Sequence, residues 1–365
     1  MINLYYQKEP YKEMLHQKTF KEDILNWFET DQRAMPWRET TNPYYIWISE
    51  VMLQQTQVKT VIDYYHRFTE RFPTVEDLSK AKQDEVLKYW EGLGYYSRAR
   101  NFHTAIQEVA AEYNGEVPDN PEEFEKLKGV GPYTKAAVMS IAFDLPLPTV
   151  DGNVFRVWSR LNNDFSDTAK QSTRKAFESE LLPYVETQAG QFNQAMMELG
   201  ALICTPKSPL CLFCPVQSHC EAFNEGTVEE LPVKTKKIKK KTIQQECFVI
   251  KNENNEYLIE QRQAKLLNGM WEFPMFEKGS SQEKLEALLG SNINLPAKAT
   301  YQLKHQFTHL TWNINVYELA NSVQSNRINT DEHYCWMDLK DRNQFNFPAS
   351  MHKILNHLER RNTQN

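Results

Sequence analysis

The sequence predicts a multidomain protein in which an all-α domain is followed by an α+β domain. At 365 residues the chain is longer than one average domain core, so two domains are expected. From about residue 8 to residue 225 apolar residues recur every three or four positions, as on buried helix faces. Three such segments are Phe20 to Phe28, Val51 to Phe68 and Phe102 to Tyr113. We therefore expect a helical domain over 8–225, a linker over 226–242 and an α+β domain over 243–360.

The composition is that of a globular protein, with 41% hydrophobic and 25% charged residues. The chain contains no run of eighteen uncharged apolar residues, which excludes a membrane-spanning helix. It begins MINLYYQKEPYKEM, without the basic start and apolar run of a secretory signal. We therefore expect a cytoplasmic, nucleoid-associated protein in a reducing compartment. The net charge of -6 argues only weakly against a nucleic-acid partner, because local charge decides such binding.

Four cysteines lie within one short segment with the spacing C-x6-C-x2-C-x5-C: Cys204, Cys211, Cys214 and Cys220. In a reducing compartment such a cluster favours a metal centre over disulfides. Structural zinc usually takes two short pairs separated by a longer spacer, whereas this nearly continuous run is typical of iron-sulfur ligands. The spacing therefore predicts a [4Fe-4S] cluster, with zinc as the alternative. Cys247 and Cys335 are isolated and are interpreted as ordinary buried cysteines.

The linker over 226–242 is rich in lysine and carries only two acidic residues. Such a run is either a solvated tether or a segment that binds phosphates. After it, short strands are expected at Cys247–Ile250, Tyr257–Glu260, Trp271–Phe273 and Leu310–Leu319, and helices at Gln282–Leu289 and Met351–Leu358.

The segment LKGVGPYT, residues 127–134, predicts a tight hairpin between two helices, within about 121–143. Gly129 and Gly131 permit the turn, and Pro132 suits the first position of the following helix. The unpaired backbone amides at that helix start are suited to bind a DNA phosphate. The alternative is a plain helix-turn-helix connection.

Two carboxylates are candidates for acid and base chemistry. Glu50 is expected two turns into a helix that begins at Asn42-Pro43, on one face with Trp47, Gln54 and Gln57. A partly desolvated carboxyl there would have a raised pKa and could act as a general acid; the alternative is a surface glutamate. Asp151 lies in the turn TVDGN, where Asp151 or Asn153 could cap the next helix and also face a substrate.

Several motifs, in order, carry a resemblance to a known family. The hairpin, the segment TVDGNVFRVWSRL and the four-cysteine run resemble the helix-hairpin-helix DNA glycosylase superfamily that includes endonuclease III. The segments MPWRETTNPYYIWISEVMLQQTQV (35–58) and WEGLGYYSRARN (90–101) are similar to MutY-type adenine glycosylases. Together with a further match in the α+β domain over 243–360, the resemblance covers nearly the whole chain.

The resemblance implies a mechanism in which Glu50 protonates adenine at N7 and makes the base a better leaving group. Asp151 would stabilise the oxocarbenium-like sugar, or form a transient covalent adduct, and Asn153 would belong to the same catalytic set. Bifunctional relatives carry a lysine at the position of Tyr133, and Lys135 lies two residues away and would point elsewhere. The resemblance therefore implies a monofunctional glycosylase that leaves an abasic site, with Tyr133 close to the nucleotide or to Asp151.

The resemblance also implies residues that bind the substrate, since a base must be flipped out of the duplex before it is cut. Arg33 and Trp37 would line the adenine pocket, and Gln55 and Thr56 would contact the opposite base. Leu93 and Tyr95, on a glycine-flanked turn, would fill or wedge the gap, although a core leucine is the ordinary interpretation of Leu93. Gln194 stands where the family often has glutamate, so it is given no acid role.

The second block resembles the Nudix-like domain with which this family recognises 8-oxoguanine, on the segment LLNGMWEFP at 266–274. The helix after it has only Glu283 and Glu286, too few carboxylates to hold Mg²⁺ for pyrophosphate hydrolysis. We interpret the domain as a lesion reader whose contacts come from Phe307, Thr308 and His309; the alternative is a β-turn with a packed phenylalanine.

The expected partner is double-stranded DNA containing adenine opposite 8-oxoguanine, bound by a monomer. Two other functions remain open at this point. An endonuclease III-like glycosylase for oxidised pyrimidines is opposed by Tyr133 and by the added reader domain. A non-catalytic iron-sulfur DNA sensor is opposed by the presence of both Glu50 and Asp151.

Overall fold

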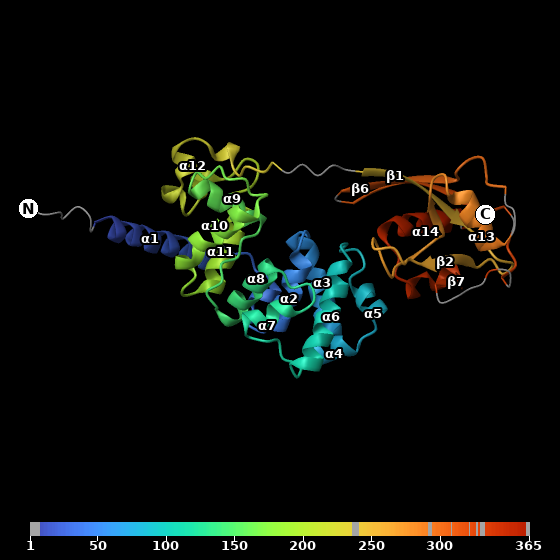
Figure 1. The fold of residues 1–365 in the computed structure, drawn as a ribbon, viewed down its shortest axis with the longest axis horizontal. Helices are drawn as coiled ribbons and strands as arrows, with labels where there is room; N and C mark the ends of the chain where they lie inside the picture. Colours follow the sequence, from blue (N-terminus) through green and yellow to red (C-terminus); the bar gives the residue numbers. More distant parts are fainter. Residues whose placement is uncertain are drawn as a thin grey trace, which may run out of the picture. The chain divides into compact units, whose positions relative to one another are not determined.

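The structure is a computed structural model that describes residues 8–235, 241–290, 294–307, 309–320, 322–325, 328 and 333–362. The chain divides into two compact units (Figure 1). Unit 1 comprises Met1–Lys80 and Asn101–Lys236, and unit 2 comprises Ala81–Arg100 and Lys237–Asn365. Among the described helices, none is long and apolar enough to cross a membrane.

Unit 1 is helical throughout. Its α-helices are α1 (Lys8–Asp31), α2 (Pro43–Leu53), α3 (Val58–Arg71), α4 (Val75–Lys80), α6 (Ser97–Glu112, which starts in unit 2), α7 (Pro121–Lys126), α8 (Pro132–Phe143), α9 (Gly152–Leu161), α10 (Gln171–Leu181), α11 (Ala189–Leu202) and α12 (Glu221–Asn224). Short 3-10 turns are η1 (Pro36–Arg38), η2 (Leu182–Tyr184), η3 (Cys211–Phe213), η4 (Gln217–His219) and η5 (Val228–Glu230). Helix α8 packs against both α2 and α11, and α11 also packs against α1 and α9 (Figure 1).

The apolar pattern from Val51 to Phe68 does not belong to one helix. Helix α2 ends at Leu53 and α3 begins at Val58, and Gln55 between them has a left-handed backbone with φ 59°. The apolar spacing runs through this break because α2 and α3 contact each other and both bury apolar residues, and no glycine or proline marks the turn.

The expected polar face of Trp47, Glu50, Gln54 and Gln57 is wrong for the same reason. Gln54 caps the end of α2 and Gln57 caps the start of α3, so they do not extend one helical face. Trp47 is buried edge-on against Phe102 and Phe124. The aromatic side chain beside Glu50 is therefore not Trp47.

Unit 2 has the predicted α+β character. Its strands are β1 (Lys241–Val249), β2 (Tyr257–Gln261), β3 (Trp271–Glu272), β4 (Met275–Glu277), β5 (Tyr301–Gln306), β6 (Leu310–Glu318) and β7 (Tyr334–Met337). Its helices are α5 (Gln83–Tyr89), α13 (Ser281–Leu289) and α14 (Ala349–Asn362), with the 3-10 segment η7 (Leu339–Gln344). The strands form one sheet of order β4-β1-β6-β5, in which β1 and β6 are parallel, and an antiparallel sheet of order β3-β2-β7.

The last three residues of strand β1 are buried on both faces of its sheet. Cys247 and Val249 face a core shared by the two sheets and α14, while Phe248 and Ile250 face a second core with α13. This alternation follows from the period of two along a strand. Cys247 is fully buried and Cys335 is partly buried, and both belong to the core of unit 2.

The segment 81–100 lies inside the range expected for the helical domain, but it packs with unit 2. The side chain of Asn346 donates a hydrogen bond to the Asp84 carbonyl at 2.6 Å, and His352 pairs with Glu91 at 2.6 Å. The turn that carries Leu93 and Tyr95 follows directly after Glu91.

Candidate active site and cysteine cluster

Unit 1 contains a cavity of about 170 Å³ among α2, α8, α9 and α11. The sequence-predicted residues that line it are Arg33, Trp37, Glu50, Thr56, Tyr133 and Asn153. Segments far apart in the chain thus converge on one space large enough for part of a flat ring system.

Glu50 lies in this cavity because of how α2 begins and packs. Asn42 caps the helix by accepting a hydrogen bond from the Tyr44 amide at 2.9 Å, and Pro43 occupies its first position. Glu50 is only 5% exposed. Burial raises its pKa to about 7, and the hydroxyl of Tyr133, which donates a hydrogen bond to Oε2 at 2.7 Å, opposes that rise. A carboxyl with this pKa can donate a proton near neutral pH.

Asp151 caps the start of α9. Its Oδ1 accepts hydrogen bonds from the amides of Asn153 at 2.8 Å and Val154 at 2.7 Å, and its Oδ2 accepts one from the Asn153 side chain at 3.0 Å. Burial raises the pKa of Asp151, although these hydrogen bonds favour its ionised form. Capping therefore fixes the carboxylate in one orientation.

Glu50, Tyr133 and Asp151 act on one another electrostatically. The charge of Asp151 raises the pKa of Glu50, and both carboxylates, after burial, raise the pKa of Tyr133. The described cavity wall includes Asn153 rather than Asp151 itself. A Cβ at Gly200 would lie 2.6 Å from the Cβ of Asn153, so glycine is needed there for α11 to approach the start of α9.

The sequence analysis missed an ion-pair group in the same cavity. Glu198 of α11 is 2% exposed and accepts hydrogen bonds from Arg33, with 2.6 Å to Oε2, and from Arg38, with 3.1 Å to Oε2. Burial opposes ionisation of Glu198, but the two arginines outweigh it and lower its pKa to about 2. Glu198 and Arg38 are about 160 residues apart, so no local spacing could have paired them. Gln194, one turn earlier, also lines the cavity.

The hairpin between α7 and α8 forms as predicted. Gly129 has φ 81°, and a Cβ there would lie 2.7 Å from the Cβ of Asn101, whereas a Cβ at Gly131 would meet open space. Pro132 is the first residue of α8. Lys135 does not enter the cavity wall but pairs with Glu125 of α7 at 2.6 Å.

The residues assigned to the opposite base and to wedging differ in exposure. Gln55 is exposed, and Tyr95 is 42% exposed with a left-handed backbone at φ 48°. A left-handed non-glycine residue is frequent where a turn serves a function. Leu93 is only 7% exposed and so packs as a core leucine here.

Phe307 and His309, two of the residues predicted to contact the lesion, lie between β5 and β6. The amide of Phe307 donates a hydrogen bond to the Leu310 carbonyl at 2.7 Å, and its ring packs edge-on against Trp312 and His305. This agrees with a β-turn carrying a packed phenylalanine. His309 is exposed, and Thr308 lies outside the described residues.

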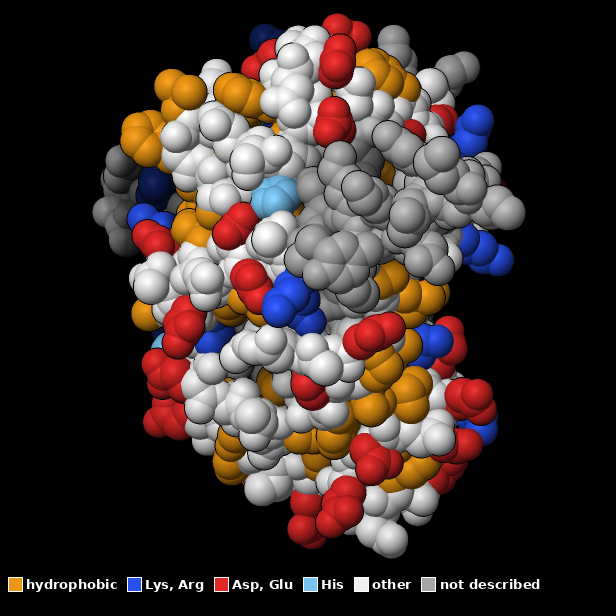
Figure 2. All heavy atoms as spheres, turned by 90° about the vertical axis from the view of Figure 1, so that its left-hand side faces the viewer, with side chains coloured by type: hydrophobic (Ala, Val, Ile, Leu, Met, Phe, Trp, Pro, Cys, Tyr) orange, Lys and Arg blue, Asp and Glu red, His pale blue; other side chains and the backbone are white. Residues whose placement is uncertain are grey.

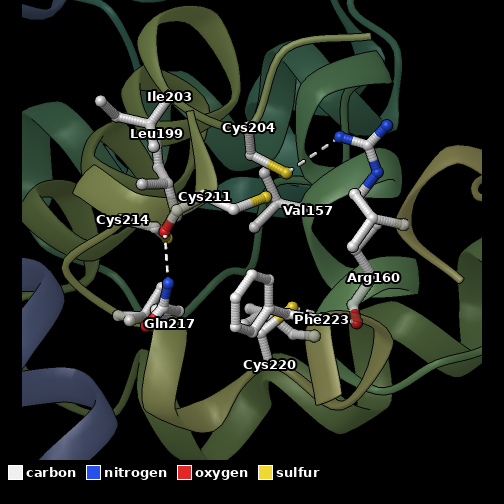
Figure 3. A pocket seen from close by; sticks show the side chains of 13 residues that line it. Val157, Arg160, Leu199, Ile203, Cys204, Cys211, Cys214, Gln217, Cys220 and Phe223 are labelled. Atoms are coloured by element: carbon white, nitrogen blue, oxygen red, sulfur yellow. Dashed lines mark hydrogen bonds between the residues drawn. The ribbon is translucent and has the colours of Figure 1, made fainter. Parts of the chain in front are cut away.

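The four cysteines surround one apolar cavity in unit 1 (Figure 3). Burial, together with the neighbouring cysteines, raises the pKa of Cys211, Cys214 and Cys220, and that of Cys214 reaches about 12. Four thiolates would repel one another here unless a cation sat among them, so this set fits a metal-containing group. Within the described part of the chain, no three His, Cys, Asp or Glu side chains are arranged to hold a single metal ion.

The surface that Figure 2 shows is of mixed charge. Acidic and basic side chains are interspersed over it, as expected for a net charge of -6. A DNA-binding surface gathers basic groups and amides, so this face does not have the charge pattern of one among the residues drawn in colour.

Comparison with known proteins identifies the family. Adenine DNA glycosylase of Buchnera aphidicola subsp. Schizaphis graminum is 34% identical over 92% of this chain and 97% of that protein. The chain belongs to the adenine DNA glycosylase family. The adenine DNA glycosylase of Rattus norvegicus is 44% identical over 58% of this chain and 44% of that protein.

Both units match known domain families. Residues 48–183 match the HhH-GPD superfamily base excision DNA repair proteins, and residues 246–357 match the NUDIX domain. A solved thermostable thymine-DNA glycosylase, 32% identical, superposes with a TM-score of 0.54 over 58% of this chain and 99% of its own. The resemblance to MutY-type glycosylases, the two-part fold and the expectation of a DNA glycosylase enzyme are thereby confirmed.

Proposed function

We propose that this protein is a monofunctional glycosylase that removes adenine mispaired with 8-oxoguanine, and also with guanine, in base excision repair. The single observation that carries the proposal is the group formed by the buried Glu50 with the half-buried Tyr133 and Asp151 beside the 170 Å³ cavity. Relatives named adenine DNA glycosylase and the Nudix match of the second unit support the choice of base and lesion.

The proposed reaction breaks the bond between N9 of adenine and C1′ of the sugar. Glu50 in its acid form transfers a proton to N7, so the bonding electron pair leaves with a neutral base. The ionised Asp151 stabilises the positive charge that develops on the sugar, directly or through a transient adduct. Water then adds at C1′ and gives its proton to the Glu50 carboxylate, which restores the acid form. Tyr133 holds the Glu50 carboxyl in place through its hydrogen bond.

The identity of residue 133 also affects whether the DNA strand is cleaved after the base is removed. A phenol hydrogen-bonded to Glu50 cannot form a Schiff base with the sugar, and the nearest lysine, Lys135, is paired with Glu125. This supports an abasic site as the product, without strand cleavage.

Two further parts belong to the proposal. Cys204, Cys211, Cys214 and Cys220 would hold a [4Fe-4S] cluster, which supplies structural order to residues 204–220 and offers no open ligand position. Phe307, Thr308 and His309 would contact the lesion from unit 2. We propose a monomer acting on double-stranded DNA in a reducing compartment.

The test is incubation with a duplex that carries adenine opposite 8-oxoguanine, followed by alkali and a denaturing gel. We expect cleavage at the adenine strand only after alkali, and loss of cleavage with retained DNA binding in Glu50→Gln. The matched control is Glu180→Gln, because Glu180 is exposed and accepts a hydrogen bond only from Trp158 among the bonds described. An active Glu50→Gln variant would refute the acid assignment, and nicking without alkali would refute monofunctional chemistry.

A further inference from the structure

The start of the linker is docked on unit 1 through Leu231–Thr235, which we call the docked segment. The amide and hydroxyl of Thr168 donate hydrogen bonds to the Val233 carbonyl at 3.0 and 2.9 Å. Asp167 accepts hydrogen bonds from the amide of Thr235, at 3.2 Å, and from its hydroxyl. Leu231 is 3% exposed. This part of the linker is thus held along the α9–α10 connection rather than free in solvent.

Arg160 of α9 joins the docked segment to the cysteine cavity. Its Nε donates a hydrogen bond to the Leu231 carbonyl at 3.1 Å, and its NH1 donates to Sγ of Cys204 at 3.3 Å and to the Thr205 carbonyl at 2.8 Å (Figure 3). Arg160 is 2% exposed, so water does not compete for these bonds. The planar guanidinium presents its donors in a rigid fork, which ties the two chain segments to one another in position.

A second contact reaches the same cavity from the linker. Val228, in the turn that precedes the docked segment, lines the cavity together with the four cysteines. A group held by the four cysteines would therefore lie in a cavity whose wall includes Val228 of the linker, and Arg160 joins the same cavity to the docked segment.

Metal ligation would strengthen the Arg160 link. A cysteine that binds a metal does so as a thiolate, and an N–H···S bond to a negative sulfur is charge-assisted and stronger than one to a thiol. Arg160 donates to Sγ of Cys204 and to the Leu231 carbonyl from the same side-chain orientation. A stronger bond to Cys204 therefore also stabilises the bond to Leu231.

We propose that Arg160 couples the metal group of the four cysteines to the docked segment, so that occupancy of the cysteines controls whether the linker stays docked. This goes beyond the catalytic function, since no residue of the active-site cavity takes part. Coupling between two sites is reciprocal: if the bound group favours docking, docking must favour retention of the group by the same factor.

The test uses Asp167 and Thr168, because they hold the docked segment and do not line the cysteine cavity, so an effect of their loss on the cluster would have to pass through docking. In the purified holoprotein we would measure the rate at which the visible absorption of the cluster is lost to a chelator. We expect the double variant Asp167→Asn with Thr168→Val, and separately Arg160→Lys, to lose it at least several-fold faster than the unmodified protein. The matched control is Arg174→Lys, since Arg174 also donates to a backbone carbonyl, that of Val150 at 2.6 Å, away from the linker.

Hydrogen exchange gives the second measurement, in which the cluster is removed and the docking of the segment is observed. Removing the cluster should raise deuterium uptake over residues 227–235 by about tenfold or more, the factor for losing one charge-assisted hydrogen bond. Uptake over α8 should stay unchanged, which separates undocking from global unfolding. Cluster loss in the double variant within twofold of the unmodified rate, or equal uptake over 227–235 with and without the cluster, would overturn the coupling.

Discussion

The hydrogen bond from Tyr133 to Glu50 gives a prediction about the pH dependence of catalysis. Burial raises the pKa of Glu50 to about 7, and the Tyr133 bond pulls it down because the hydroxyl stabilises the ionised carboxylate. Catalysis needs the protonated form, so activity falls as the pH rises through this pKa. In Tyr133→Phe the opposing bond is lost, and the alkaline limb of the pH profile must move to higher pH.

The size of the shift follows from the strength of that bond. A hydrogen bond to a charged group contributes about 1.5 to 3 kcal/mol, which corresponds to about 1 to 2 pH units. The assay is kcat/KM for adenine excision between about pH 6 and pH 10, which reports groups of the free enzyme. The matched control is Tyr113→Phe, because Tyr113 donates a similar bond, of 2.9 Å, to the half-exposed Glu123, which lies outside the cavity wall.

The direction in which the alkaline limb of the pH profile moves decides whether Tyr133 stabilises ionised Glu50. A lower plateau of kcat/KM in Tyr133→Phe would be compatible with this role of Tyr133, since the Glu50 carboxyl would also be less well oriented. An alkaline limb that stays in place, or moves to lower pH, would show that Glu50 is not the group that titrates or that Tyr133 does not stabilise its ionised form.

Three further predictions follow from the same cavity and the hairpin. Gly129→Ala should weaken DNA binding by at least tenfold, because Gly129 has a φ of 81° and an added Cβ would lie 2.7 Å from the Cβ of Asn101. Gly131→Ala should not weaken it, since an added Cβ there meets open space. Equal dissociation constants of the two variants in a DNA titration would contradict this. Glu198→Gln should lower the free energy of unfolding in urea by about 2 kcal/mol at pH 7, since it removes the charge that pairs with the half-buried Arg38 and with the more exposed Arg33. The pKa of Glu198 is about 2 in the folded protein against an ordinary 4.5, so the stability that its ionised form contributes is present above pH 4.5 and is lost as the pH falls through 2. The free energy of unfolding of the variant should therefore fall less steeply with decreasing pH than that of the unmodified protein. A destabilisation below 1 kcal/mol at pH 7 would count against the ion pair. Tyr133→Lys should add strand nicking without alkali, and its absence on a denaturing gel would show that this position does not reach the sugar.

Some of the site could be located from the sequence because the signal is local. The cysteines stand close together in the chain, and the structure gathers all four around one cavity. The glycines of the hairpin and the capping turn at Asp151 are likewise encoded within a few residues, since turns and caps depend on short-range backbone geometry. Those elements form where they were expected.

Other features of the site had no such signal. The pairing of Glu198 with Arg33 and Arg38 joins residues about 160 positions apart, and neither partner has a neighbour in sequence that marks it. The role of Tyr133 as the hydroxyl on Glu50 likewise required α2 and α8 to pack together.

The sequence by itself determined the two-domain plan, the helical and α+β character of each part, the hairpin and the grouping of the four cysteines, because periodicity and short spacings encode local geometry. Only the tertiary structure decided where α2 ends, which aromatic side chain meets Glu50, and that the linker begins as a segment docked beside the cysteines. These depend on burial, which raises the pKa of Glu50 and holds Arg160 in place, and burial is a property of packed neighbours rather than of the residues that follow one another in the chain.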